Sequence, residues 1–263
     1  MDTETLLKNE SLLRQLEHSL KTVGAQSRNK LSIPGFDIFI DPHSDAYHLS
    51  FAAPSSLGKG SWAEAIGEMK QIFSERGRRA RLEYFHELYP DLAEALEKAG
   101  FNRDMRAPVM ILLKKDFSDP ESPGGYLELT PENSNLLEGY LRRQSLAYGG
   151  NGGDGALAWL DSMKKGLQTG DLMVGALELS DEFVSGASIQ IGGGVGELAG
   201  VWTLPEKQKQ GLAYKLCQRL SNDYFDQGYD LCWLSAAEGA LRLYEKLGFM
   251  VVGTQLNYGL PEG

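Results

Sequence analysis

The sequence predicts a globular α/β protein made of two halves, and three observations lead to this fold class. The 263 residues are 42% hydrophobic and 24% charged, which is typical of folded soluble domains. Helical and extended apolar patterns alternate along the chain. Residues 116–125 (DFSDPESPGG) have a linker composition of Pro, Ser, Gly and acids. We therefore expect two domains, residues 1–120 and 121–263.

The charge of the chain is acidic, and the second half carries most of it. Twenty-six basic and 36 acidic residues give a net charge of −10, of which −3 falls on residues 1–125 and −7 on residues 126–263. This balance disfavours a nucleic-acid-binding face and favours cationic partners such as amines.

Several features indicate a cytoplasmic protein without a membrane partner. No apolar run approaches the ~18 residues of a membrane span, and the start, Met1-Asp2-Thr3-Glu4, is acidic and unlike a signal peptide. Cys217 and Cys232 lack metal-ligand spacing and fit reduced core residues. Four scattered histidines also lack such spacing, so no metal site is expected.

In the second half, the patterns predict the order β-α-α-β-β-β-α-β-α-β. Thr130 is expected to cap the first helix, with Pro131 at its first position. The three middle strands form hairpins around Ser180-Asp181-Glu182 and Gly192-Gly193-Gly194. The expected strands are 126–129, 172–179, 184–191, 195–204, 230–235 and 250–252, and the later helices begin near residues 156, 211 and 241.

Both halves contain an amphipathic helix followed by Gly, an aromatic residue and an apolar run. In the first half this is residues 92–101, and in the second it is residues 241–249. Glycine ends a helix readily because it adopts the left-handed conformation at little cost. The similarity fits a duplication, and it also fits the general frequency of helix-Gly-strand units.

Residues 201–213 (VWTLPEKQKQGLA) combine a strand, a proline, a polar loop and small residues at a helix start. The first turn of a helix has unpaired N–H groups and a partial positive charge, which suit a phosphate. The glycine fingerprints of dinucleotide and P-loop sites are absent. Taken alone, Gly211-x-Ala213 fits a phosphate site or close helix–sheet packing.

The pattern Gln208-x-x-Gly211-x-Ala213, followed by the strand 231–235 and by LYEKLGF at residues 243–249, resembles the GNAT superfamily of acyl-CoA-dependent N-acyltransferases. The resemblance covers about residues 126–263, including the element order. It implies a GNAT fold, in which helices flank a central, mostly antiparallel mixed sheet.

The first half more loosely resembles the degenerate N-terminal half of tandem GNAT proteins. The matching residues are 81–84, 88–90 and 96–101. This half lacks the acyl-CoA loop; Gly58-x-Gly60 is its only candidate and is expected to lie in the wrong context.

The resemblance implies acetyl-CoA as a co-substrate and no metal. The amides that would bind the pyrophosphate fall on Gln208, Lys209, Gln210, Gly211, Leu212 and Ala213, with Gln208 in place of the usual Arg. The splayed strand that would bind the pantetheine arm and the thioester carbonyl falls on Val201, Trp202 and Thr203. These three residues also fit an ordinary core strand.

Tyr244 occupies the place of the family's tyrosine, which protonates the leaving thiolate; a packing role is its alternative. Glu197 is the candidate base for the amine, and it is expected to share a strand face with Ala199, Val201 and Thr203. A solvated strand-end role remains open for Glu197, and Glu178 and Asp181 are rivals. Ala237 stands where an Asn is common, with Ser235 or Glu238 as possible replacements.

The predicted function is transfer of acetyl from acetyl-CoA to an amine, on a small molecule or a peptide, by direct attack in a ternary complex. The alternative is a non-catalytic acyl-CoA sensor or interaction module. The Gly-rich residues 149–155 form either a wall of the acceptor pocket or a surface turn. A tandem chain is expected to be a monomer with an internal pseudo-dimer, or a homodimer.

Overall fold

A computed structural model describes residues 3–117, 123–237 and 239–262. Part of the predicted linker (residues 118–122) and Glu238 lie outside these ranges. The chain forms two compact units. Unit 1 comprises residues 1–109, 235–238 and 251–263, and unit 2 comprises residues 110–234 and 239–250. Unit 1 thus includes two short segments from the second half of the sequence, residues 235–238 and 251–263. The domain boundary at residue 120 stays a prediction.

Unit 1 is a sheet with the strand order β1-β2-β3-β4-β11-β5. β3 pairs with β4 in parallel, and the β1–β2, β2–β3 and β4–β11 pairs are antiparallel. A core of aromatic and aliphatic side chains, including Phe36, Phe73 and Tyr84, packs between this sheet and two helices, α2 and α3. Its elements are α1 (Thr3–Ser27), β1 (Asn29–Ile33), β2 (Phe36–Ile40), η1 (Tyr47–Leu49), β3 (Phe51–Pro54), α2 (Trp62–Glu75), β4 (Arg81–Phe85), η2 (His86–Leu88), α3 (Leu92–Lys98) and most of β5 (Asn102–Leu113) and β11 (Met250–Gly259).

Unit 2 is a mixed sheet with the strand order β10-β9-β8-β7-β6, and the end of β5 lies beside β10. The pairs from β6 to β9 are antiparallel, and β9 pairs with β10 in parallel. Its elements are η3 (Lys114–Asp116), β6 (Tyr126–Leu129), η4 (Pro131–Asn133), α4 (Ser134–Ala147), η5 (Asp154–Trp159), α5 (Leu160–Thr169), β7 (Leu172–Leu179), β8 (Glu182–Gly192), β9 (Val195–Thr203), η6 (Pro205–Lys207), α6 (Leu212–Asp226), β10 (Leu231–Ser235) and α7 (Leu241–Lys246).

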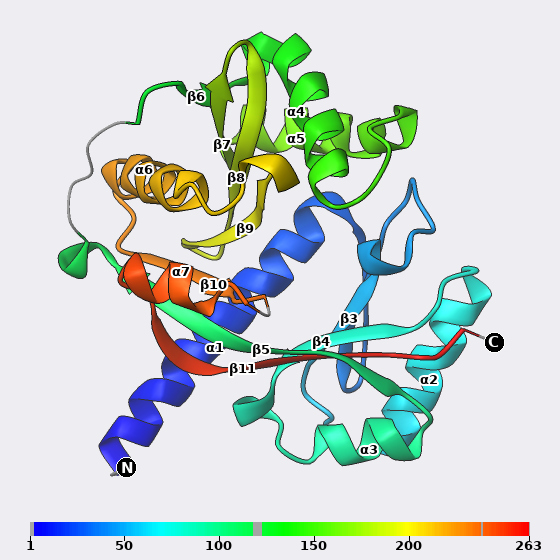
Figure 1. The fold of residues 1–263 in the computed structure, drawn as a ribbon. Coiled ribbons are helices and arrows are strands. Elements are labelled where there is room, and N and C mark those ends of the chain that lie inside the picture. Colours follow the sequence, from blue (N-terminus) through cyan, green and yellow to red (C-terminus); the bar gives the residue numbers. More distant parts are fainter. Residues whose placement is uncertain (1–2, 118–122, 238, 263) are drawn as a thin grey trace. The chain divides into compact units, whose positions relative to one another are not determined.

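Helices cover both faces of the unit 2 sheet. α4 and α5 lie on one side of β7–β9 and α6 lies on the other (Figure 1). A Cβ on Gly186 would lie 2.4 Å from Tyr140 of α4, whereas a Cβ on Gly196 would lie 2.7 Å from Tyr224 of α6. These glycines let the large aromatic side chains pack directly on opposite faces of the strands.

The predicted α/β class and the order β-α-α-β-β-β-α-β-α-β are confirmed. The β7–β8 hairpin turns at Ser180 and Asp181, both with positive φ, as a two-residue turn requires. The predicted capping of α4 is wrong. Residues 131–133 form a 3-10 turn, and α4 begins after Asn133, whose side chain accepts a hydrogen bond from the Thr130 N–H at 2.8 Å.

The two units repeat one arrangement. In each, a strand, a loop, a helix, a parallel strand and a short helix follow one another: β3-α2-β4-α3 and β9-α6-β10-α7. The short helices end identically, because Phe101 N–H donates to the Leu96 carbonyl at 3.0 Å and Phe249 N–H donates to the Tyr244 carbonyl at 2.9 Å. The intervening Gly100 and Gly248 both have positive φ. The sequence similarity of residues 92–101 and 241–249 therefore reflects a shared local structure.

Among the described helices, none combines the length and the apolar character needed to cross a lipid bilayer.

Candidate functional site

A β-bulge distorts β9 where the sequence placed the cofactor strand. Ser188 pairs with Ala199, but Gly186 pairs with Trp202, so β9 has one extra residue opposite β8. Gly200, with a φ of +60°, occupies the extra position. A bulge of this kind bends the strand and interrupts its ladder.

β9 and β10 stop pairing before the bulge. In their parallel register Gly196 pairs with Cys232 and Glu197 pairs with Trp233, and no later residue of β9 pairs with β10. Leu204 N–H bonds to Val184 on β8. Along a strand, the N–H and C=O groups of successive residues point alternately to one side and to the other. Because those of Leu204 point to β8, the peptide groups of Val201 and Thr203 point away from β8, toward the unpaired edge. An extended ligand can therefore bond to this edge as an additional strand would.

The bulge changes which side chains share a face, and it overturns one expectation. Residues paired across a sheet lie on the same face, so Glu197, Ala199 and Trp202 share the face covered by α4. Thr203 pairs with Ser185 on the opposite face, covered by α6. The prediction that Glu197 and Thr203 share a face is therefore wrong, because one extra residue reverses the alternation.

The three residues of the splayed strand have different surroundings. The Trp202 side chain is 3% exposed and packs on Tyr140 with ring centroids 5.4 Å apart. The Ser185 hydroxyl donates to the Trp202 carbonyl at 2.7 Å and lies 2.9 Å from the Thr203 hydroxyl. Trp202 therefore packs in the core. The N–H groups of Val201 and Thr203 are left as the candidate contacts for a ligand, because the two carbonyls accept hydrogen bonds from the Tyr148 and Gln208 side chains.

The loop after β9 leads to a helix start without a side-chain cap. The Gln208 side-chain amide donates to the Thr203 carbonyl at 3.3 Å, tying the loop to the strand. Lys209 and Gly211 have φ values of +61° and +78°. Gly211 is the N-cap, and the helix begins with Lys215 N–H bonding to the Gly211 carbonyl. The N–H groups of Leu212, Ala213 and Tyr214 therefore have no partner within the helix.

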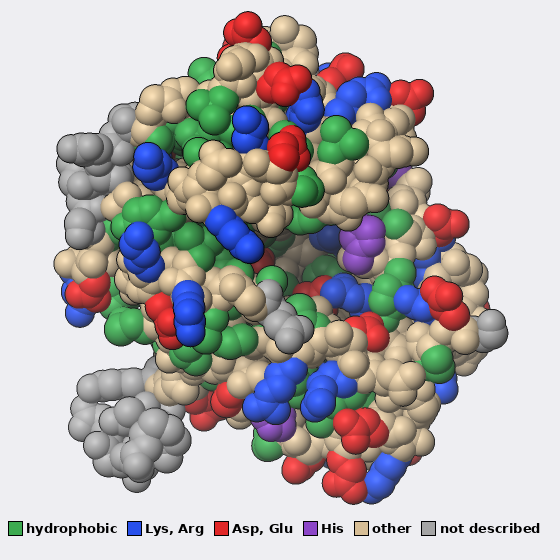
Figure 2. All heavy atoms as spheres, viewed as in Figure 1, with side chains coloured by type: hydrophobic (Ala, Val, Ile, Leu, Met, Phe, Trp, Pro, Cys, Tyr) green, Lys and Arg blue, Asp and Glu red, His purple; other side chains and the backbone are tan. Residues whose placement is uncertain are grey.

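Positive charge gathers around this helix start although the second half of the chain is acidic. Lys and Arg side chains lie over the region of α6 and α7 (Figure 2). The Lys246 ammonium of α7 lies 4.5 Å from the centroid of the Tyr214 ring in the first turn of α6. Sequence reasoning did not single out Lys246, although it is part of the LYEKLGF motif.

Tyr244 lies in α7 and is 7% exposed. No hydrogen bond to its hydroxyl is found among the described residues. Burial raises the pKa of the Tyr244 phenol above its ordinary value, and the neighbouring Cys217 thiol and Tyr148 phenol raise it further. At neutral pH the phenol is therefore protonated and available to donate.

Tyr148, which sequence reasoning also missed, lies beside the bulge. Its hydroxyl donates to the Val201 carbonyl at 3.3 Å, and its side chain is 61% exposed. The sequence offers one signal for this position: Tyr148 directly precedes Gly149, a helix-ending glycine with a φ of +83° that follows α4.

The Gly-rich loop that follows is tied to α4. The Arg142 guanidinium donates to the Gly152 carbonyl at 2.8 Å and to Asp154 at 2.9 Å, and Gly150 N–H donates to the Ser145 carbonyl at 2.8 Å. The loop therefore has a defined conformation, which an unconstrained surface turn would lack.

The other candidates lie on other elements. Glu178 lies on β7, two strands or about 10 Å from β9. Asp181 forms the β7–β8 turn. The Ser235 hydroxyl donates to the Gln255 side chain, and Glu238 lies outside the described residues. Within the described part of the chain, no three His, Cys, Asp or Glu side chains come together as metal ligands would.

Comparison with known proteins identifies this region. Residues 152–249 match the model of the Acetyltransferase (GNAT) family. Residues 152–249 therefore form a GNAT domain.

Solved structures share the fold over nearly the whole chain. A GCN5-related N-acetyltransferase from Kribbella flavida is 23% identical, with a TM-score of 0.75, and the match covers 95% of this chain and 96% of that one. A GCN5-related N-acetyltransferase from Sphaerobacter thermophilus is 14% identical, with a TM-score of 0.65 and coverages of 96% and 92%.

A tandem GNAT protein from the clavulanic acid biosynthesis pathway is 13% identical, with a TM-score of 0.56 and coverages of 87% and 80%. At these identities the likeness is one of fold. No curated protein matches the sequence. The predicted GNAT fold is confirmed.

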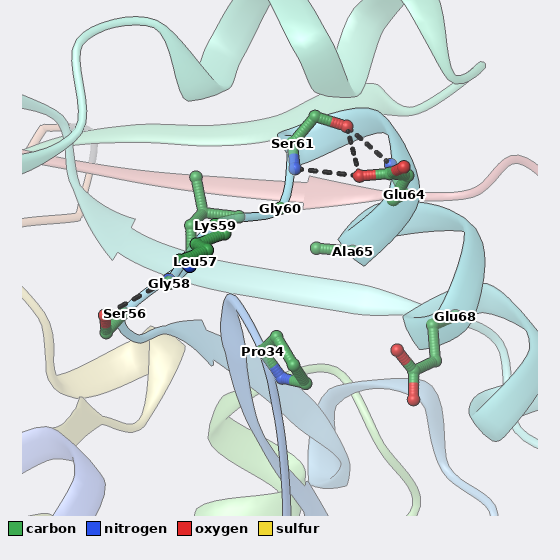
Figure 3. Close-up of a pocket in the computed structure, with 10 residues that line it drawn as sticks. All are labelled: Pro34, Ser56, Leu57, Gly58, Lys59, Gly60, Ser61, Glu64, Ala65 and Glu68. Atoms are coloured by element: carbon green, nitrogen blue, oxygen red, sulfur yellow. Dashed lines mark hydrogen bonds between the residues drawn. The ribbon is translucent and has the colours of Figure 1, made fainter.

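Unit 1 has a counterpart of the β9–α6 loop in residues 55–61, between β3 and α2. Gly58-x-Gly60 therefore lies between a strand and a helix, as Gly211 does, and the expectation that this half lacks an acyl-CoA loop stays a prediction. The start of α2 is closed, however, because Ser61 N–H donates to the Glu64 carboxylate at 3.0 Å and Glu64 N–H donates to the Ser61 hydroxyl at 3.4 Å (Figure 3). This capping box satisfies the N–H groups of Ser61 and Glu64. It also places a carboxylate at the start of α2, where the carboxylate would repel an anion.

The adjoining pocket of about 460 Å³ is also poorly suited to a diphosphate. Glu64, Glu68 and Lys59 are its charged lining residues, and the two carboxylates outweigh the ammonium. Leu96, which is fully buried, takes the place of Tyr244 in the repeated arrangement. Unit 1 thus has the same order of strands and helices as this part of unit 2, but it lacks an uncapped helix start and a counterpart of Tyr244.

We expect one acetyl-CoA to bind per chain, because the Glu64 carboxylate caps the start of α2, whereas the start of α6 has no side-chain cap. Isothermal titration calorimetry of the full chain with acetyl-CoA should give a stoichiometry near one. A stoichiometry near two would contradict the assignment of Glu64 as a permanent cap.

Proposed function

We propose that this protein transfers the acetyl group of acetyl-CoA to a primary amine by direct attack in a ternary complex. The observation that carries the proposal is that β9 no longer pairs with β10 after Glu197, where the Gly200 bulge follows, next to an uncapped helix start. The splay leaves peptide groups for an extended arm, and the helix start suits a diphosphate. The GNAT match of residues 152–249 supports this assignment.

In the proposed complex, the amides of residues 208–213 bind the pyrophosphate, with Lys246 as an added positive charge. The peptide edges of Val201 and Thr203 bind the pantetheine arm and polarise the thioester carbonyl. Holding both reactants in one site removes much of the entropic barrier to their encounter.

The reaction has three proton transfers. The bound ammonium first gives a proton to Glu197, which leaves a lone pair on the nitrogen. The neutral nitrogen attacks the carbonyl carbon, the carbon–sulfur bond breaks, and Tyr244 gives its proton to the departing sulfur. The nitrogen then gives its second proton to the Tyr244 phenolate, which restores the phenol. Four residues, or about 13 Å of extended strand, separate Glu197 from Val201, so the transfer to Glu197 runs through water.

An amine panel tests the proposal by release of free CoA. We propose 1,5-diaminopentane, tyramine, glucosamine and a blocked peptide with one lysine, with glutamate as an acidic comparison. The net charge of −7 on residues 126–263 favours the cationic amines over glutamate. Turnover of at least one amine supports an enzyme. Acetyl-CoA binding without any turnover would indicate the alternative, an acyl-CoA sensor, and absence of binding would reject both.

A further inference from the structure

Tyr148 is held at the reaction centre by the end of α4. Its backbone N–H bonds to the Gln144 carbonyl at 3.1 Å and to the Ser145 carbonyl at 3.2 Å, as part of the last turn of the helix. The left-handed Gly149 then turns the chain away. The backbone from which the phenol projects is therefore fixed, although the side chain itself is 61% exposed.

Two polar groups meet beside the bulge of β9. The Tyr148 hydroxyl bonds to the Val201 carbonyl at 3.3 Å. Tyr148 also lies close enough to Tyr244 to contribute to the raised pKa of the Tyr244 phenol. Tyr148 comes from α4, whose helix covers the face of Glu197, whereas the cofactor loop leads into α6 on the other face. Tyr148 therefore approaches the centre from the side of the proposed base.

The phenol suits an alkylammonium ion. Its proton is committed to the Val201 carbonyl, so its oxygen lone pairs are free to accept a hydrogen bond from an N–H group. Its exposed ring face can pack on the carbon chain of an alkylammonium ion and can attract the ammonium charge. The carbonyl end of α4 carries partial negative charge, which also favours a cation there.

We infer that Tyr148 contacts the acceptor amine and selects for primary ammonium groups on an alkyl chain. This inference rests on the proposed function, because it assigns the acceptor side of the same site. Tyr148 would guide the amine to the thioester, and Glu197 would then take up its proton through water.

The test compares Tyr148→Phe and Tyr148→Leu with the wild type, using the fastest cationic amine of the four-compound panel. Tyr148→Phe removes the oxygen and keeps the ring, so we expect the KM for the amine to rise about tenfold while kcat stays within about twofold. Tyr148→Leu also removes the ring and should raise this KM further. The Kd for acetyl-CoA should be unchanged in both variants.

A matched control is Tyr229→Phe, which removes a hydroxyl elsewhere in unit 2 and keeps the stacking of that ring on Tyr224. An unchanged amine KM in Tyr148→Phe would overturn the inference. A parallel rise in the Kd for acetyl-CoA would also overturn it, because Tyr148 would then act through the Val201 carbonyl on the cofactor. If the wild type acetylates no amine of the panel, the proposed function fails, and the inference fails with it.

Discussion

Replacing Tyr244 by Phe is expected to lower kcat by about 10²- to 10³-fold at neutral pH, the usual size of a general-acid contribution. The Kd for acetyl-CoA should change little, because the variant keeps the ring that packs on Phe249 with centroids 5.9 Å apart. Steady-state kinetics with saturating amine, together with calorimetric binding of acetyl-CoA, separate the two effects.

The pH dependence of this variant gives a second readout. A thiolate whose parent thiol has a pKa of about 8.5 leaves without a proton above that pH. The ratio of wild-type to variant kcat should therefore fall as the pH rises past this value. The wild-type Tyr244 stays protonated beyond its ordinary range because its pKa is raised, so its own ionisation should not reduce activity below pH 10. A ratio near one at every pH would exclude Tyr244 as the acid, and Tyr229→Phe again serves as the control.

Replacing Ala213 by Asp is expected to weaken acetyl-CoA binding about 100-fold and to leave folding intact. Ala213 lies in the first turn of α6, where a carboxylate stabilises the helix. The same carboxylate repels a diphosphate at the N–H groups of that turn, and two unit charges 4 Å apart repel by about 4 kcal/mol at an intermediate dielectric constant. Calorimetry measures the Kd, and thermal unfolding measures the stability.

Ala213→Asn is the matched neutral control, since asparagine has nearly the size and shape of aspartate without its charge. It should bind acetyl-CoA within about threefold of the wild type, because a neutral amide does not repel phosphate. Unchanged binding in Ala213→Asp would place the cofactor elsewhere and would reject the proposed function. A loss of unfolding cooperativity in Ala213→Asp would instead show that α6 itself had been disrupted.

The sequence predicted the elements of unit 2 and the GNAT likeness well, because both depend on local signals. Apolar periodicity, turn residues and helix-ending glycines act within a few residues. The LYEKLGF segment and the Gly211-x-Ala213 step are contiguous, so their spacing could be read directly. The capping box at Ser61 and Glu64 is also a local signal, although the sequence analysis did not use it. It caps the start of α2, the counterpart of α6 in unit 1.

The face on which Glu197 lies, the contacts of Tyr148 and the exchange of short segments between the units depended on the tertiary structure. The extra residue at Gly200 reverses the side-chain alternation of β9, and it becomes evident only when β9 is aligned with β8. Tyr148 and Val201 are 53 residues apart and meet only because α4 packs on that sheet. Strand partners and helix packing are set by contacts between distant segments, and patterns within one segment do not encode them.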